Sequence, residues 1–180
     1  MVGSSLGVNP MRIRTALQGI LFLTTVFFVL PRAFVGLNDR LGWPRWETGA
    51  GEVIGGVLIV AAIGVMLHCS QVFRSLGQGT PVPIEPPTKL VHAGLYRYSR
   101  NPIYVADVAV WLGVFLIAGH LALLVYAGLM FVLIEAAVVW WEEPVLVERF
   151  GAEYEDYRRR VPRWLGPVRP AALEEPRSAH

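Results

Sequence analysis

The sequence has few of the features that mark a soluble or secreted protein. Its 180 residues include one cysteine, Cys69, which excludes an internal disulfide and leaves the redox compartment undetermined. Only 17% of the residues are charged, the net charge is +2, and the arginines form no basic tract, so nothing indicates a nucleic-acid partner. In contrast, 54% of the residues are hydrophobic and the mean hydropathy is +0.46. These values predict an integral membrane protein of one domain.

Four apolar segments are candidates for transmembrane helices, at residues 16–37, 52–72, 102–118 and 121–141. The first segment follows two arginines, as the apolar part of a signal peptide does, but it lacks a convincing small-residue cleavage site. We therefore expect a retained span, with a kink at Pro31. The second contains Gly55, Gly56 and Gly64, which predict close helix approach. Only Gly119 and His120 separate the last two segments, which predicts a tight helical hairpin over residues 102–141.

The polar segments complete the predicted organisation. We expect a cytoplasmic N-terminus at 1–14, two transmembrane helices within 15–72, a functional core at 73–166 and a disordered tail at 167–180. Within the core, an apolar and aromatic face recurs at helical spacing, at Leu146, Phe150, Tyr154, Tyr157 and Val161. The sequence therefore predicts an all-α membrane protein with about four transmembrane helices and a cytoplasmic amphipathic C-terminal helix at 143–161.

The distribution of lysine and arginine predicts the orientation of these spans. With four spans, the N-terminal segment, the long polar loop and the C-terminal segment share one side and carry 13 such residues (Arg12, Arg14, Arg74, Lys89, Arg97, Arg100, Arg149, Arg158, Arg159, Arg160, Arg163, Arg169 and Arg177). The other side carries 3, which are Arg32, Arg40 and Arg45. Because positive charge favours the cytoplasmic side, both termini are expected in the cytoplasm.

Polar residues of the predicted hairpin fall at matching depths. Asn101 lies about 18 residues before the turn and Glu142 about 22 after it, a difference in depth of about 6 Å at the helical rise. Arg100, Asn101, Glu142 and Glu143 are therefore expected to meet at the cytoplasmic mouth. Such a cluster binds a ligand with cationic and anionic parts, or it is an ordinary surface ion-pair cluster; spacing alone leaves both open.

Two acidic residues lie deeper in the same hairpin. Asp107 and Glu135 each occupy an apolar helix and are expected to pair at equal depth, either as functional groups or as bonds to a neighbouring helix. His68 and Cys69 lack the further partners that a metal ion needs, so no metal site is predicted.

The run from Gly94 to Tyr104, GLYRYSRNPIY, is followed about forty residues later by the run from Glu142 to Tyr157, EEPVLVERFGAEYEDY, and then by Val161-Pro-Arg163. This pair of motifs resembles the integral-membrane methyltransferases, a superfamily that includes isoprenylcysteine carboxyl methyltransferase and the phospholipid N-methyltransferases. The resemblance covers residues 90–164, nearly half of the chain. It makes the segment 73–166 the expected methyltransferase core.

The resemblance implies a cofactor, S-adenosylmethionine, held between the two motifs. The positions that match its cofactor-binding elements are His92, Gly94, Leu95, Tyr96, Arg100, Asn101, Pro102, Tyr104, Glu142 and Glu143. Asn101 stands where many members have histidine, and an amide cannot carry a proton near neutral pH. Candidate catalytic residues are Arg163, which would orient a carboxylate acceptor, and Glu135 or Asp107, which would assist an amine acceptor in losing its proton.

The expected reaction is methyl transfer to a lipophilic or lipid-attached acceptor at the cytoplasmic membrane face, with membrane lipid as the partner. The acceptor is a carboxylate as in isoprenylcysteine, a phospholipid amine or a thiol, and the sequence does not choose among them. Two alternatives stay open. One is a membrane reductase that uses NADPH, because membrane sterol reductases have a similar helical arrangement, and the other is a non-catalytic membrane scaffold.

Overall fold

The computed structural model describes residues 10–46, 49–77 and 89–166, and within these ranges the chain is helical and has no strand. The predicted disordered tail, most of the N-terminal segment and the middle of the polar loop lie outside the described residues. The helices are α1 (Pro10–Thr24), α2 (Leu30–Arg40), α3 (Gly49–Val72), α4 (Pro102–Ala118), α5 (Leu121–Ala137), α6 (Glu143–Phe150) and α7 (Ala152–Arg160). Short π-helical turns are η1 (Thr25–Val29), η2 (Phe73–Gly77) and η4 (Val138–Glu142), and η3 (Gly94–Arg97) is a 3-10 turn.

Three helices of the described part are long and apolar enough to cross a membrane, at Arg14–Arg40, Gly49–Ser75 and Leu121–Phe150. They identify an integral membrane protein. The predicted span at Pro102–Ala118 forms the apolar helix α4, but its 17 residues are fewer than the roughly 20 that a full crossing needs. The fourth crossing, and with it the orientation of the termini, stays a prediction.

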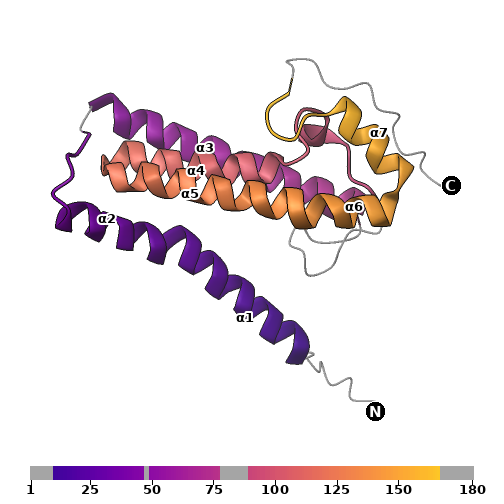
Figure 1. Cartoon of the computed structure of the whole chain (residues 1–180), viewed down its shortest axis with the longest axis horizontal. Coiled ribbons are helices and arrows are strands. Elements are labelled where there is room, and N and C mark those ends of the chain that lie inside the picture. The colour runs from indigo at the N-terminus through magenta and orange to yellow at the C-terminus, as the bar shows by residue number, and fades with distance from the viewer. Residues whose placement is uncertain (1–9, 47–48, 78–88, 167–180) are drawn as a thin grey trace, which may run out of the picture.

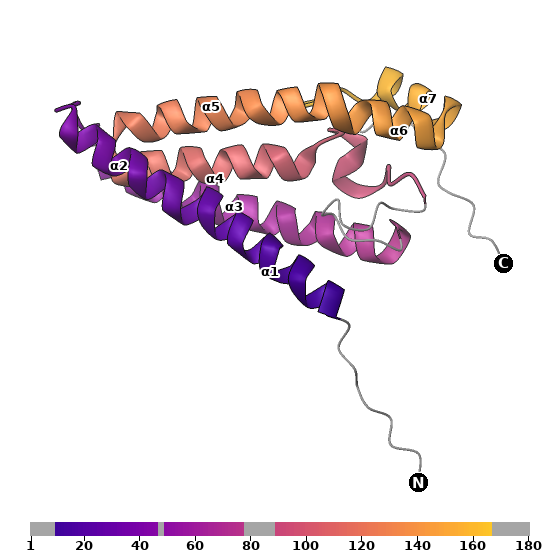
Figure 2. The ribbon, with the colours of Figure 1, turned by 60° about the horizontal axis from the view of Figure 1, so that its bottom comes forward.

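Helices α3, α4 and α5 lie side by side along the molecule, and α1 and α2 form a long arm that diverges from them toward the N-terminus (Figures 1 and 2). Helix α3 packs closely against α4, since a Cβ on Gly55 would lie 2.6 Å from the Gly113 carbonyl oxygen. Gly55 therefore has the predicted role of a small contact residue. Gly56 and Gly64 do not, because a Cβ at either position would have no neighbour within 4 Å.

The turn between α4 and α5 is the predicted tight hairpin. Gly119 adopts φ 68°, a left-handed conformation that glycine accepts without strain, and its N–H donates to Phe115 O. The loop between α2 and α3 covers this turn, since Trp46 N donates to Gly119 O at 2.6 Å. The buried Asn38 side chain accepts a hydrogen bond from Ala122 N at 3.1 Å, so α2 caps the start of α5.

The predicted kink at Pro31 takes the form of the π-helical turn η1. Leu30 N donates to Thr25 O in π register, and the next donor in that register would be Pro31, which has no N–H. The carbonyl of Val26 therefore loses its partner within the helix. Instead, it accepts a hydrogen bond from the Tyr126 hydroxyl of α5. The kink thus creates the acceptor that ties the N-terminal arm to the rest of the bundle.

Pro144 produces the same structure further along the chain. Glu143 N donates to Val138 O in π register, and Pro144 again supplies no following donor. Because the π turn absorbs the proline, α5 continues through η4 into α6 as one helix over Leu121–Phe150. The prediction of a single amphipathic helix over 143–161 is therefore wrong in its bounds. This segment contains two helices, α6 and α7, which are divided at Gly151. Its φ of 51° and ψ of −125° form a backbone conformation that favours glycine.

We expect Tyr126→Phe to lower the free energy of unfolding by about 1 to 2 kcal/mol, because it leaves the buried Val26 carbonyl without a donor. The aromatic contacts with Phe34 and Trp111 remain in this variant. Thermal unfolding in detergent measures the change. Tyr98→Phe, at a half-buried tyrosine outside the arm, is the matched control and should unfold like the parent. Equal stability of the two variants would contradict this role for Tyr126.

Candidate active site

The candidate site lies at the end of the bundle where α4 begins and α5 passes into α6. Asn101 precedes α4, Pro102 occupies its first turn, and the Asn101 N–H donates to Ser99 Oγ at 3.1 Å. Proline suits this position because its missing N–H has no helical partner there. The turn at residues 99–101 is thereby fixed, and Arg100 points from it toward α6, where it meets Glu143 (NH1 to Oε1, 3.0 Å).

Glu143 is the centre of an ion-pair network. Arg163 binds it with two nitrogens, Nε to Oε1 at 2.8 Å and NH2 to Oε2 at 3.1 Å. Only 11% of the Glu143 side chain and 10% of the Arg100 side chain are exposed, so little solvent screens these pairs. The sequence-based prediction that Arg100 and Glu143 meet is confirmed.

Arg163 also reaches Glu135, with NH1 at 2.6 Å from Oε1. The second oxygen of Glu135 accepts the indole N–H of Trp164 at 2.8 Å. The hydrogen bonds with Glu143, more than any other interaction, raise the pKa of the Arg163 guanidinium, which therefore remains charged. Glu135 is thus paired with Arg163 and Trp164 and not, as expected, with Asp107.

The segment Pro162–Trp164, here called the strap, is tied to the turn at 99–101 through the backbone. Arg100 N donates to Pro162 O at 3.0 Å. Ser99 Oγ and Asn101 Nδ2 both donate to Arg163 O, each at 3.2 Å. The Asn101 amide therefore holds the strap and, through it, the position of the Arg163 side chain. Sequence reasoning missed Ser99 and Trp164, although Trp164 directly follows a motif residue.

Tyr104 and Glu142 form a second contact between α4 and the α5 end. The Tyr104 hydroxyl donates to Glu142 Oε2 at 3.0 Å. Asp107 lies one helical turn further along α4 and is close enough to Tyr104 to interact with it electrostatically. The predicted convergence of α4 residues with the paired glutamates is therefore observed for Glu142 as well.

Two tyrosines of α7 pack beneath the network. Tyr154 OH accepts a hydrogen bond from Arg100 NH1 at 3.2 Å, and Tyr157 OH donates to Tyr96 O at 2.7 Å. Burial raises the pKa of both phenols, so both hydroxyls stay protonated. These contacts give Tyr154 and Tyr157 a packing role, as members of the apolar and aromatic face that the sequence predicts.

The first part of the predicted cofactor motif packs elsewhere. Tyr96 is buried against Cys69 and Phe73 at the end of α3, and burial raises its pKa. A Cβ on Gly94, with φ 59°, would lie 2.7 Å from His68 Nε2. Leu95 packs on the same cluster, and the His92 ring lies 6.3 Å from that of Tyr157. The structure thus brings Arg100, Asn101, Tyr104, Glu142 and Glu143 together and places His92 to Tyr96 between α3 and α7.

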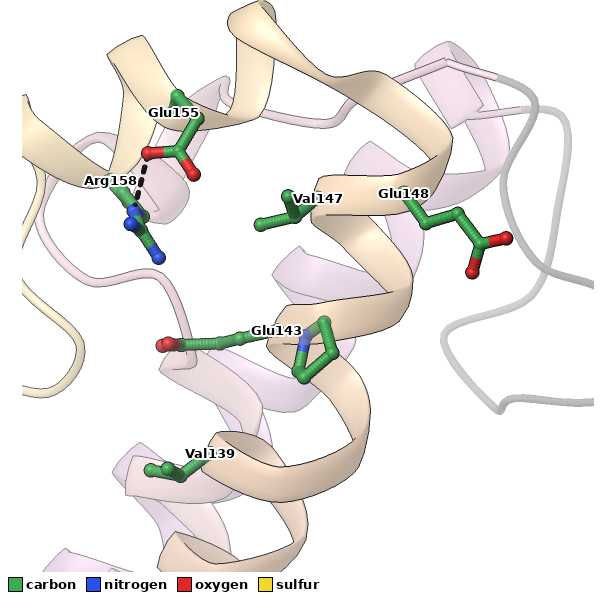
Figure 3. Close-up of a pocket in the computed structure, with 7 residues that line it drawn as sticks. Val139, Glu143, Val147, Glu148, Glu155 and Arg158 are labelled. Atoms are coloured by element: carbon green, nitrogen blue, oxygen red, sulfur yellow. Dashed lines mark ion pairs between the residues drawn. The ribbon is translucent and has the colours of Figure 1, made fainter.

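A cavity of about 400 Å³ opens beside Glu143, on the side of α6 that faces α7 (Figure 3). This volume is within the range of small-molecule sites. Among the predicted site residues Glu143 lines it, and the others are Val139, Pro144, Val147, Glu148, Glu155 and Arg158. Arg158 pairs with Glu155 at 2.8 Å at the rim.

The donors and acceptors of the network suit a small ligand that carries both charges. Arg100 Nε is buried and has no hydrogen-bond partner among the described residues, so an anionic group of a ligand would satisfy it. The Glu142 carboxylate binds a neutral tyrosine hydroxyl, with no arginine paired to it in the described part of the chain. No arginine of the described residues therefore competes with a cationic group of a ligand for Glu142. The described residues contain no group of three or more His, Cys, Asp or Glu that would hold a metal ion.

Comparisons with known proteins agree with this chemistry. The sequence profile of the phospholipid methyltransferase family matches residues 51–153, more than half of the 180 residues. A methanethiol S-methyltransferase 2 of Bradyrhizobium diazoefficiens is 39% identical over 69 residues. That match covers 38% of this chain and 25% of the relative, so the chain aligns with only about a quarter of the relative's length.

Proposed function

The chain belongs to the phospholipid methyltransferase family, and from this premise we propose that it is a membrane methyltransferase. In this proposal it uses S-adenosylmethionine to methylate a lipophilic or lipid-attached acceptor at the cytoplasmic membrane face. Three observations support the proposal: the two sequence motifs, their meeting at Arg100, Glu142 and Glu143, and the apolar helices around them. The meeting of the motifs carries it, because residues about forty positions apart form one charged site next to lipid.

S-adenosylmethionine, when bound, supplies a methyl group on a sulfonium sulfur, whose bond to the methyl carbon breaks with the electron pair staying on sulfur. The donor thus carries its own leaving group, and the protein mainly has to orient the reactants and exclude water. Arg100 would hold the carboxylate of the donor, and Glu142 and Tyr104 would hold its ammonium or hydroxyl groups. Glu143, already neutralised by two arginines, would keep Arg100 in position.

The acceptor enters from the lipid in this proposal. A carboxylate of the isoprenylcysteine type, a phospholipid amine and a thiol all remain candidates, and the name of the relative adds methanethiol to the last class. Arg163 would orient a carboxylate, whereas an amine or thiol would need a proton acceptor such as Glu135 or Asp107. With four spans, the 13 lysines and arginines on the side of both termini support a site in the cytoplasmic leaflet.

Calorimetry tests the proposal directly. We expect the full chain, purified in detergent, to bind S-adenosylmethionine and to transfer labelled methyl groups to extracted lipids or prenylated thiols. Glu142→Gln should weaken cofactor binding about tenfold or more, because it removes the charge that faces the ammonium. Glu153→Gln, at an exposed position of α7 that does not line the cavity, is the matched control. A folded protein that binds NADPH but not S-adenosylmethionine would favour the reductase, and one that binds neither would favour the scaffold.

A further inference from the structure

The carboxylates of the site differ in how many of their oxygens are already bound. Both oxygens of Glu143 contact arginine, and the two oxygens of Glu135 bind Arg163 and Trp164. Each oxygen of these two carboxylates already accepts at least one hydrogen bond, so a reactant would have to compete with Arg100, Arg163 or Trp164 for it. Glu135, which the sequence offers as a proton acceptor, is therefore a structural counter-ion of Arg163.

Asp107 is in the opposite situation. It makes no hydrogen bond or ion pair with any residue of the ranges 10–46, 49–77 and 89–166, although it lies in the apolar helix α4. A carboxyl group at such a position is costly unless it has a function or faces water. It lies one turn from Tyr104 on the same side of the helix, so it adjoins the Tyr104–Glu142 contact.

The charges of the site lead to the same residue. Arg100 and Arg163 are the cations of the network, and they pair with Glu143 and Glu135. Glu142 and Asp107 remain without a cation among the described residues. Glu142 suits the ammonium of the methyl donor, which leaves Asp107 for the other reactant. An anionic acceptor beside Asp107 would place two negative charges together in a low-dielectric site, which is unfavourable.

We propose that Asp107 is the catalytic proton acceptor, and that the methyl acceptor is therefore a nucleophile that carries a proton, a thiol or an amine, and not a carboxylate. The acceptor atom forms its bond to the methyl carbon, and its proton passes to an oxygen of Asp107 and then to water. This inference rests on the proposed function. It excludes the isoprenylcysteine carboxylate type of acceptor and removes Glu135 and Arg163 from direct contact with the reactants.

Acceptor analogues that share one alkyl chain test this assignment. Dodecanethiol, dodecylamine and dodecanoic acid are supplied to the purified protein with labelled S-adenosylmethionine. We expect methylation of the thiol or the amine and none of the acid. Asp107→Asn should lower kcat about a hundredfold with little change in KM, and Asp107→Glu should restore part of the rate.

A readout that does not depend on turnover separates this proposal from its premise. Calorimetry of S-adenosylmethionine binding should give the same dissociation constant for Asp107→Asn as for the parent, which also shows that the variant folds. Methylation of dodecanoic acid, or full kcat in Asp107→Asn with the thiol and the amine, would overturn the role of Asp107. Failure of the parent to bind S-adenosylmethionine would instead overturn the proposed function.

Discussion

Replacing Glu143 by glutamine is expected to lower kcat/KM for methyl transfer about a thousandfold and the free energy of unfolding by about 3 kcal/mol. The reason is that Arg100 and Arg163 share this carboxylate, at 3.0 and 2.8 Å, and both lose their counter-charge in the variant. Removing one partner of a poorly solvated ion pair leaves the other charge uncompensated. Initial rates with labelled cofactor and thermal unfolding in detergent measure the two effects.

Glu153→Gln is the matched control for this experiment. Glu153 lies on the neighbouring helix α7, its side chain is exposed, and it does not line the cavity. A charge change there should alter the free energy of unfolding by less than about 0.5 kcal/mol and leave kcat/KM near that of the parent. If the two variants behaved alike, Glu143 would not be the centre of the network.

The position of the site could be predicted from the sequence because it depends on helix geometry. The short connection at Gly119 requires that α4 and α5 run antiparallel, and the constant rise of a helix then brings Arg100 level with Glu143. Apolar runs of about 20 residues likewise give the spans directly. Both predictions need only the number of residues between two positions, which can be counted in the sequence.

The strap could not be predicted in the same way. Its bonds join Ser99, Asn101 and Glu135 to Pro162–Trp164, which lies outside any periodic segment. Helical periodicity carries no information on which distant side chain a loop residue meets. For the same reason, the sequence does not indicate that the Asn101 amide donates to the Arg163 carbonyl. The role of Asn101 as a cofactor ligand stays a prediction.

The sequence predicts a kink at Pro31 but not the π-helical turns, because apolar periodicity does not show how a helix accommodates a proline. It also predicts that the last span ends at residue 141 and that a separate amphipathic helix begins at 143, next to Pro144. In the structure the turn η4 takes up the proline, and Glu142 and Glu143 stay on the continuous helix that leaves the bundle. This continuity sets the direction in which the two carboxylates point, Glu142 toward Tyr104 and Glu143 toward Arg100.

The strap is expected to depend on Arg163 more than on any other residue. Arg163→Gln removes a positive charge that pairs with both Glu135 and Glu143. We expect the variant to lower the free energy of unfolding by about 3 kcal/mol. This is the lower end of the range for such pairs, because about a quarter of the Arg163 side chain is exposed. The loss of kcat/KM should reach about a hundredfold or more, because Arg163 no longer holds Glu143, the residue that positions Arg100. Thermal unfolding and initial rates provide both values.

A double-mutant cycle then distinguishes a charge-balancing arginine from one that contacts the reactants. If Arg163 serves mainly to neutralise the carboxylates, adding Glu135→Gln to Arg163→Gln should recover about 1 kcal/mol of stability. Arg159→Gln, which breaks an exposed pair with Asp156 on α7, should cost less than about 1 kcal/mol and serves as the control. Additive losses in the double variant would show that Glu135 and Arg163 do not act as a pair. Glu135 would then return as a candidate proton acceptor beside Asp107.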